Sequence, residues 1–146
     1  MHPLATHRLL SSHLRKLDQR IRAAGWTINL TGVNLTVDMV QRATGEVFRL
    51  AIVADEYPLM PVAVHFLPAL QRPAEAKWPF DGNYVFRTNG SRPFVCLSGI
   101  RSFVPDSTDA LKYLGTEEIH IGAVLGNLDK ALNDPRCTGA VYLPLK

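Results

Sequence analysis

The sequence has few cysteines and no long uncharged apolar run. Its 146 residues include two cysteines, Cys96 and Cys137, which are too few for a disulfide framework and favour a reduced, cytoplasmic protein. No stretch approaches the roughly eighteen uncharged apolar residues of a membrane span. Residues 1–10 also lack the apolar core of a secretory signal. With 47% hydrophobic and 20% charged residues, the sequence predicts a single globular domain, residues 1–146, without a membrane partner.

The motifs of several common chemistries are missing too. No glycine-rich phosphate loop follows a strand pattern, no G-x-S-x-G elbow occurs, and no cysteine–histidine group has zinc spacing. We therefore expect no metal and no cofactor. A cysteine–histidine hydrolase stays open as an alternative, because folding can bring His65 or His120 to a thiol. The simpler expectation is that His65 is a strand residue and His120 a residue of the last helix.

Positive charge is concentrated at the start of the chain. The net charge is +3, yet residues 1–24 alone hold five basic residues against one acidic residue, Asp18. A nucleic-acid groove spreads Lys and Arg over several elements and interleaves aromatic residues, so we expect no nucleic-acid partner. Two interpretations of the basic segment stay open, a helix face that binds an acidic partner and a solvated outer face.

Two segments have the apolar period of a helix. The first predicts a helix that begins near Pro3 and ends at Gly25. The second predicts a helix with Thr116 as N-cap, ended by Asp134-Pro135. The expected apolar stripes are Leu10, Leu14, Leu17, Ile21 and Ala24 in the first helix, and Ile121, Val124, Leu125, Leu128 and Leu132 in the second. Gly122 and Gly126 lower the helix propensity of the second segment, which indicates close packing there.

Alternating apolar residues predict four strands between the helices, near residues 26–31, 33–39, 48–53 and 62–66. Gly32 marks either a turn or a bulge, and Thr44-Gly45 predicts a turn. Residues 67–115 contain repeated prolines and are expected to have little regular structure, and long ordered segments of that kind tend to be functional. The order predicts an α+β fold with an N-terminal helix, an antiparallel four-stranded meander, a long active-site stretch and a C-terminal helix.

Cys96 lies in a setting that differs from that of an ordinary buried cysteine. It belongs to the irregular stretch and follows the turn-like Asn89-Gly90-Ser91, which brings backbone amides and small polar side chains. A reactive thiol needs such a polar and partly exposed site. Cys137, which follows Pro135-Arg136, has no comparable neighbours, and we interpret it as structural or incidental.

The order of these landmarks resembles the ubiquitin-conjugating enzymes and their bacterial relatives over roughly residues 4–135. That family begins with an amphipathic helix and a four-stranded antiparallel meander, and a Y-P-x-x-P turn such as Tyr57–Pro61 leads into the last strand. The N-G-x…C-L run around the family's active cysteine is similar to residues 89–97. Phe103–Pro105 corresponds to the aromatic-x-Pro step that follows, and Asp134-Pro135 to the D-P dipeptide after the last helix.

The sequence also departs from the family pattern. The His-Pro-Asn triplet that precedes the family's cysteine is absent, and Phe86-Arg87-Thr88-Asn89 occupies that neighbourhood. Asn89 either stabilises the oxyanion, as the family's asparagine does, or is simply the turn residue of Asn89-Gly90. Ser98 stands where many relatives have an acidic residue, and the family's later C-terminal helices are not evident. The chain therefore resembles a divergent bacterial-type member, of the kind found with an activating enzyme and a ubiquitin-like protein in anti-phage systems.

This resemblance implies a thioester relay. Cys96 is the expected nucleophile, Asn89 a candidate for oxyanion stabilisation, and Asp106 and Asp109 either assist the incoming amine by charge or act as turn and cap residues. The implied partners are a ubiquitin-like protein, its activating enzyme and a target protein. In relatives the first helix helps to dock the activating enzyme, so the candidate docking residues are Arg8, Arg15, Lys16 and Arg20. The alternative function is a catalytically inactive binding module with the same fold.

Overall fold

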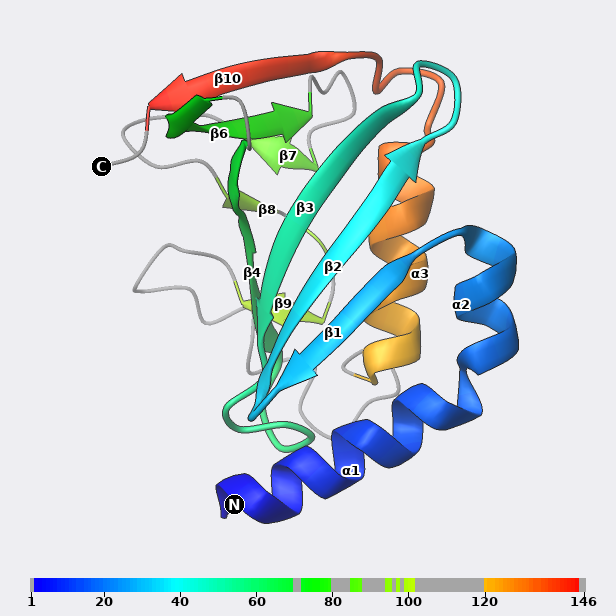
Figure 1. Cartoon of the computed structure of the whole chain (residues 1–146), viewed down its shortest axis with the longest axis vertical. Helices are drawn as coiled ribbons and strands as arrows, with labels where there is room; N and C mark the ends of the chain where they lie inside the picture. The colour runs from blue at the N-terminus through cyan, green and yellow to red at the C-terminus, as the bar shows by residue number, and fades with distance from the viewer. Residues whose placement is uncertain are drawn as a thin grey trace.

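The computed structural model describes residues 2–69, 72–79, 85–87, 94, 95, 97, 99–101 and 120–144. Its main sheet contains four antiparallel strands in the order β1-β2-β3-β4, and a short fifth strand, β9, joins β4 in parallel (Figure 1). The strand bounds are β1 Thr27–Thr31, β2 Asn34–Gln41, β3 Glu46–Val53, β4 Val62–Phe66 and β9 Ile100–Arg101. The predicted α+β class and the antiparallel four-stranded sheet are therefore confirmed.

One face of this sheet carries the core, as the alternating pattern predicts. Leu35, Val37 and Met39 of β2 are buried, and so are every second residue of β3 from Phe48 and of β4 from Val62. The register of β1 against β2 follows from a tight turn. Gly32 begins the two-residue connection between β1 and β2 with φ 62°, a left-handed conformation that glycine adopts without strain. Gly32 is therefore a turn residue and does not form a bulge.

The first helical segment is divided in two. Helix α1 spans Pro3–Lys16 and helix α2 spans Asp18–Ala24, with Leu17 between them at φ −94° and ψ 3°. The Leu17 amide donates to the carbonyl of Leu14, three residues back, which tightens the last turn of α1 and changes the direction of the chain. The prediction of one unbroken helix is wrong. The apolar stripe nevertheless continues across the break, because Leu14, Leu17 and Ile21 all pack against the core.

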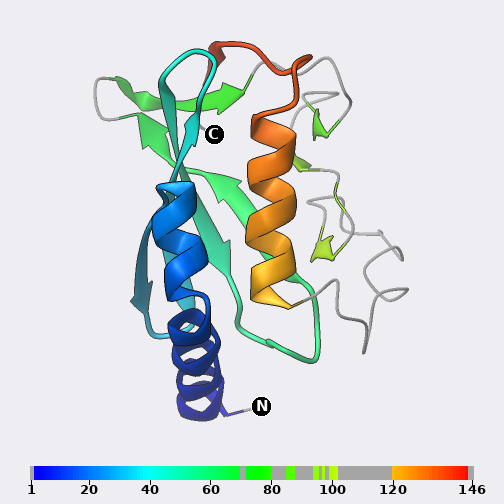
Figure 2. The same ribbon diagram turned by 90° about the vertical axis from the view of Figure 1, so that its right-hand side faces the viewer.

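Helix α3, Ile121–Leu132, lies along the core face of the sheet (Figure 2). Its five predicted stripe residues are all fully buried. The predicted start at Thr116 is wrong. His120 is the N-cap, with extended backbone at φ −62° and ψ 138°, and its Nδ1 accepts the Gly122 amide at 3.0 Å. Thr116 itself lies outside the described residues.

The expectation of little regular structure in residues 67–115 is also wrong, because strand β6 runs through Arg72–Pro79. It pairs with β5, Pro68–Ala69, and with β10, Ala140–Pro144, in a small sheet at the end of the molecule opposite α1 (Figure 1). A second short pair joins β7, Phe86–Arg87, to β8, Phe94–Val95. Strand β9 also belongs to that stretch, and positions 70, 71, 80–84, 88–93, 96, 98 and 102–115 lie outside the described residues.

The prolines that obscured β6 stand where a strand tolerates them. Strand β10 pairs with residues 75–79 of β6, so Pro73 lies outside this ladder and Pro79 stands at its end. Between them, Ala76 and Trp78 alternate as buried positions, and Trp78 belongs to the same core as β3 and β4. No helix in the described part of the chain is long and apolar enough to cross a membrane.

Candidate functional site

The two predicted catalytic residues, Cys96 and Asn89, lie outside the described residues, as do Asp106 and Asp109. The structure does describe the chain on both sides of Cys96. On one side, Val95 is 1% exposed and pairs with Phe86 across the β7–β8 ladder. On the other side, Ile100 pairs with Val62 at the start of β4. The segments that flank Cys96 in the sequence are therefore joined to the core.

An aromatic cluster underlies this region. Phe66 of β4 packs edge-on against Trp78 of β6 with ring centroids 4.4 Å apart, and Phe86 of β7 contacts both rings at 5.7 and 6.4 Å. These rings join three strands of three different sheets, and edge-to-face contacts of this kind stabilise a fixed geometry. The indole nitrogen of Trp78 is buried and has no hydrogen-bond partner among the described residues.

The four candidate docking residues, Arg8, Arg15, Lys16 and Arg20, are all exposed on α1 and α2. No ion pair connects any of them to a described residue. Arg20 differs from the other three, because its guanidinium lies directly against Gly126 of α3 and occupies the space that a side chain would fill there. Arg22 is paired with Asp18 one turn away at 3.2 Å. The basic face is thus open to solvent, and Arg20 also connects α2 to α3.

Tyr57, in the turn between β3 and β4, joins α1 to α3. Its side chain is fully buried, and its hydroxyl accepts the backbone amide of Ile121 at 3.1 Å. The same hydroxyl lies 2.7 Å from Nδ1 of His13 in α1. Burial raises the pKa of Tyr57, and the hydrogen bond from Ile121 opposes that rise. The Tyr-Pro turn is evident in the sequence, but this role of its tyrosine is not.

His13 and His120 stack on each other beside Tyr57. Their ring centroids are 4.4 Å apart with an interplanar angle of 29°. The pKa of His13 is lowered by burial first, then by His120 and then by Lys16. This stacking was not predicted, since a lone histidine on a helix has no distinctive sequence signal. The expectation that His120 is an ordinary helix residue is wrong, because it is the N-cap of α3.

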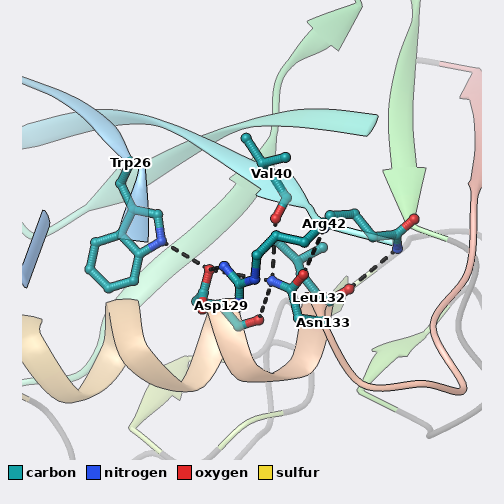
Figure 3. A network of polar contacts seen from close by, with 7 residues as sticks. Trp26, Val40, Arg42, Asp129, Leu132 and Asn133 are labelled. Carbon is teal, nitrogen blue, oxygen red and sulfur yellow. Dashed lines mark hydrogen bonds and ion pairs between the residues drawn. The ribbon is translucent and has the colours of Figure 1, made fainter. Parts of the chain in front are cut away.

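A second polar network joins the C-terminal half of α3 to the β2–β3 hairpin. Asp129 accepts hydrogen bonds from the Trp26 indole at 3.0 Å and from both terminal nitrogens of Arg42, at 3.4 and 3.1 Å (Figure 3). Asn133 donates to the carbonyl of Val40 and accepts from the Arg42 amide. These donors and acceptors bond to one another within the protein, so the network holds α3 against the hairpin and has a structural role.

Cys137 belongs to a buried structural cluster, in agreement with its predicted role. It is 2% exposed, and the side-chain amide of Gln41 donates to its carbonyl at 3.0 Å and to its sulfur at 3.5 Å. The amide oxygen of Gln41 accepts from the Gly139 amide and the Thr44 hydroxyl. Gln41 is itself fully buried, and these contacts satisfy both ends of its amide.

The described residues also bear on the cysteine–histidine hydrolase alternative and on metal binding. His65 lies on β4 opposite Ala51, on the face that alternates with the buried residues Val64 and Phe66. The ring of His120 already uses Nδ1 for the helix cap. Within the described ranges, no three His, Cys, Asp or Glu side chains are grouped so that they can hold a metal ion.

Comparison of the chain with protein-family models, with curated proteins and with solved structures finds no match.

Proposed function

We propose that this protein is a divergent, bacterial-type relative of the ubiquitin-conjugating enzymes. It accepts a ubiquitin-like modifier from an activating enzyme as a thioester on Cys96 and passes it to an amine of a target protein. The observation that carries this proposal is the order of elements. A first helix is followed by an antiparallel four-stranded sheet, and a Tyr-Pro-x-x-Pro turn precedes the fourth strand. We further propose a cytoplasmic setting in an anti-phage conjugation system.

The packing of the last helix gives further support. Helix α3 covers the sheet, and the tyrosine of the Tyr57–Pro61 turn binds the first amide of that helix. The β7–β8 ladder and the pairing of β9 with β4 join both flanks of Cys96 to the same core. A thiol that receives a large acyl group benefits from rigid flanks, because its attack geometry is then set before the partner arrives.

The proposed reaction proceeds in two acyl transfers. The Cys96 thiolate attacks the carbonyl of the thioester on the activating enzyme, a new thioester forms, and the cysteine of the activating enzyme leaves as a thiolate. The target amine then attacks this thioester and loses a proton, an amide bond forms, and the Cys96 thiol is released. A free cysteine has a pKa of about 8.5 and a lysine of about 10.4. The second step therefore requires help with deprotonation, which we assign to the negative charge of Asp106 and Asp109.

Asn89 and the basic helix face complete the proposal. Asn89 stabilises the oxyanion by donating a hydrogen bond to the developing charge. Arg8, Arg15, Lys16 and Arg20 dock an acidic surface of the activating enzyme, and all four are exposed for such a contact. These encounters are brief, because successive partners must use the same protein in turn.

A charging assay tests this function. The protein is incubated with its activating enzyme, the modifier and ATP, and the products are separated on gels with and without reductant. We expect an adduct that reductant removes, that Cys96→Ala abolishes, and that Cys96→Ser converts to a reductant-resistant ester. Cys137→Ala is the matched control and should charge normally.

Two results would change the assignment. An adduct that persists in Cys96→Ala would place the reacting group elsewhere. No adduct at all, with folded protein and an activating enzyme that has charged itself, would leave the same fold acting as a binding module.

A further inference from the structure

Three elements far apart in the sequence meet at His13, Tyr57 and His120. His13 lies on α1, Tyr57 in the turn between β3 and β4, and His120 caps α3. The Tyr57 hydroxyl is 2.7 Å from His13 Nδ1 and 3.1 Å from the Ile121 nitrogen. The two imidazoles stack with centroids 4.4 Å apart. This His13–Tyr57–His120 joint is a direct polar connection between α1 and the start of α3.

The hydrogen bonds in the joint have a fixed direction. The Ile121 amide can only donate, so the Tyr57 oxygen accepts it. Tyr57 is fully buried, so its hydroxyl hydrogen needs an acceptor, and His13 Nδ1 is the one that the described residues provide. The geometry thus assigns His13 as a neutral imidazole with its hydrogen on Nε2. His120 is neutral for the same reason, because its Nδ1 accepts the Gly122 amide at 3.0 Å.

A proton on either ring reverses one of these bonds. Protonated His13 would turn Nδ1 into a donor, and the Tyr57 hydroxyl would then receive two donors and lose the acceptor for its own hydrogen. Protonated His120 would lose the lone pair that caps α3. The stacked rings would also repel each other if both were charged.

Among the described residues, most of the groups around the joint oppose protonation of His13. Lys16 on α1 is cationic, the Tyr57 hydroxyl from the turn is neutral, and His120 from α3 stacks on the His13 ring. The start of α3 contributes the positive end of its helix dipole, which opposes protonation, whereas His13 lies in the last turn of α1, where the negative end of that helix dipole favours it. Burial, His120 and Lys16 all lower the pKa of His13.

We propose that this joint is a pH-sensitive contact, closed while His13 and His120 are neutral and loosened when they gain protons. Opening would release the basic helix face on α1 from its alignment with α3. The inference rests on the described side chains and holds whether or not Cys96 carries a modifier. Burial lowers the pKa of His13. The unfolded chain therefore binds a proton at His13 more readily than the closed joint does, and the contact weakens as the pH falls below the ordinary histidine value of about 6.5.

The first test uses the unmodified protein. Proton NMR follows the His13 and His120 ring signals during a titration, and hydrogen exchange, corrected for its intrinsic pH dependence, follows the amides of α1, Ile121 and Gly122. We expect His13 to titrate below about pH 6.5. Amide protection should fall about fivefold between about pH 7.5 and pH 5.5, the effect of one lost N-cap hydrogen bond. Unchanged protection, or a His13 that titrates at or above the ordinary value, would overturn the proposal.

The second test removes the titration and keeps the acceptors. In the double variant His13→Gln, His120→Asn, both amide oxygens can still accept a hydrogen bond, and asparagine is a good N-cap. This variant should show no pH-dependent loss of protection over the same interval. His7→Gln is the matched control on the same helix. His7 Nδ1 lies 2.6 Å from the Gly32 carbonyl, which can only accept, so this bond persists in either charge state.

We expect His7→Gln to keep the full pH response of the unmodified protein. A double variant that also keeps that response would locate the sensitivity outside the joint and refute the inference.

Discussion

The side chain of Leu17 covers Gly122. A Cβ atom added to Gly122 would lie 3.2 Å from Cδ2 and 3.3 Å from Cδ1 of Leu17, so the leucine at the break between α1 and α2 fits where α3 lacks a side chain. Gly126, one turn along α3, is covered in the same way by the guanidinium of Arg20. Both glycines thus face the α1–α2 segment, but the neighbour of Gly122 is a packed leucine, whereas the neighbour of Gly126 is the flexible end of an exposed arginine.

This difference predicts opposite effects of substitution. Gly126→Ala should stabilise the protein by about 0.5–1 kcal/mol, because Arg20 can move aside and alanine favours the helix. Gly122→Leu should destabilise it by about 1–3 kcal/mol, because Leu17 and the cap are already packed there. The midpoints of urea unfolding measure both effects. Equal stability of Gly122→Leu and the unmodified protein would mean that the Leu17 contact is not restrictive.

Removal of the Asp129 carboxylate should strongly lower the stability of the folded protein. Asp129→Ala leaves the Trp26 indole without its acceptor and removes the ion pair with Arg42, and we expect a loss of about 2–4 kcal/mol in the free energy of unfolding. Asp38→Ala is a matched control, because Asp38 also makes a two-bond pair with an arginine, Arg49, but on the open face of the sheet. Its effect should be clearly smaller. Similar losses in both variants would indicate that the Trp26 bond contributes nothing.

Tyr57 predicts a dependence on alkaline pH. Burial raises its pKa above the ordinary 10.0, so the folded protein keeps a proton that the unfolded chain releases. The corresponding stability is complete below about pH 10 and is lost as the pH rises through the folded value. Ultraviolet absorbance of the phenolate should show a late titration step that Tyr57→Phe removes and Tyr142→Phe leaves in place. A late step that survives in Tyr57→Phe would belong to another residue.

The burial of Cys137 predicts that its thiol is protected. In Cys96→Ala, Cys137 is the remaining cysteine, and it is 2% exposed beneath Gln41. A thiol reagent should therefore label this variant slowly in buffer and rapidly in denaturant. Mass spectrometry after timed quenching gives both rates. Fast labelling of the native variant would show that the segment around Cys137 opens readily.

Charge reversal tests the basic helix face. Arg15→Glu with Lys16→Glu should slow charging in the assay described above, and the slowing should be greater at low salt because exposed charges are less screened there. Lys130→Glu with Arg136→Glu, which reverses two exposed cations outside α1, carries the same change in net charge and is the control. Charging at the normal rate in the first variant would remove α1 from the docking surface.

Periodicity was sufficient to predict the parts of the fold that depend on local pattern. The stripe of α3 and the alternation of β2, β3 and β4 are read directly from which residues are apolar. Strands β6 and β10 were missed for two reasons. Prolines stand near both ends of β6, and its partner lies about sixty residues further along the chain, so nothing local identifies the pair. The break at Leu17 was missed because the apolar stripe continues through it.

Some parts of the candidate site could be predicted from the sequence and others could not. The exposure of Arg8, Arg15 and Lys16 follows from their positions off the apolar stripe, and the structure agrees. The His13–Tyr57–His120 joint requires three separate elements to come together, and histidine is not a usual N-cap, so no local sequence pattern predicts it. The role of Cys96 stays a prediction, since it lies outside the described residues.

The pairing of β6 with β10 has a consequence for the order of folding. On the ribosome, β1 to β4 can pair with their neighbours as soon as residues 27–66 have emerged, because each hairpin closes over a short loop. Strand β6 emerges soon afterwards but must wait for residues 140–144 before its main ladder can form. During that interval the edge of β6 that later pairs with β10 has unpaired backbone groups, and residues 140–144 supply their partners when they emerge.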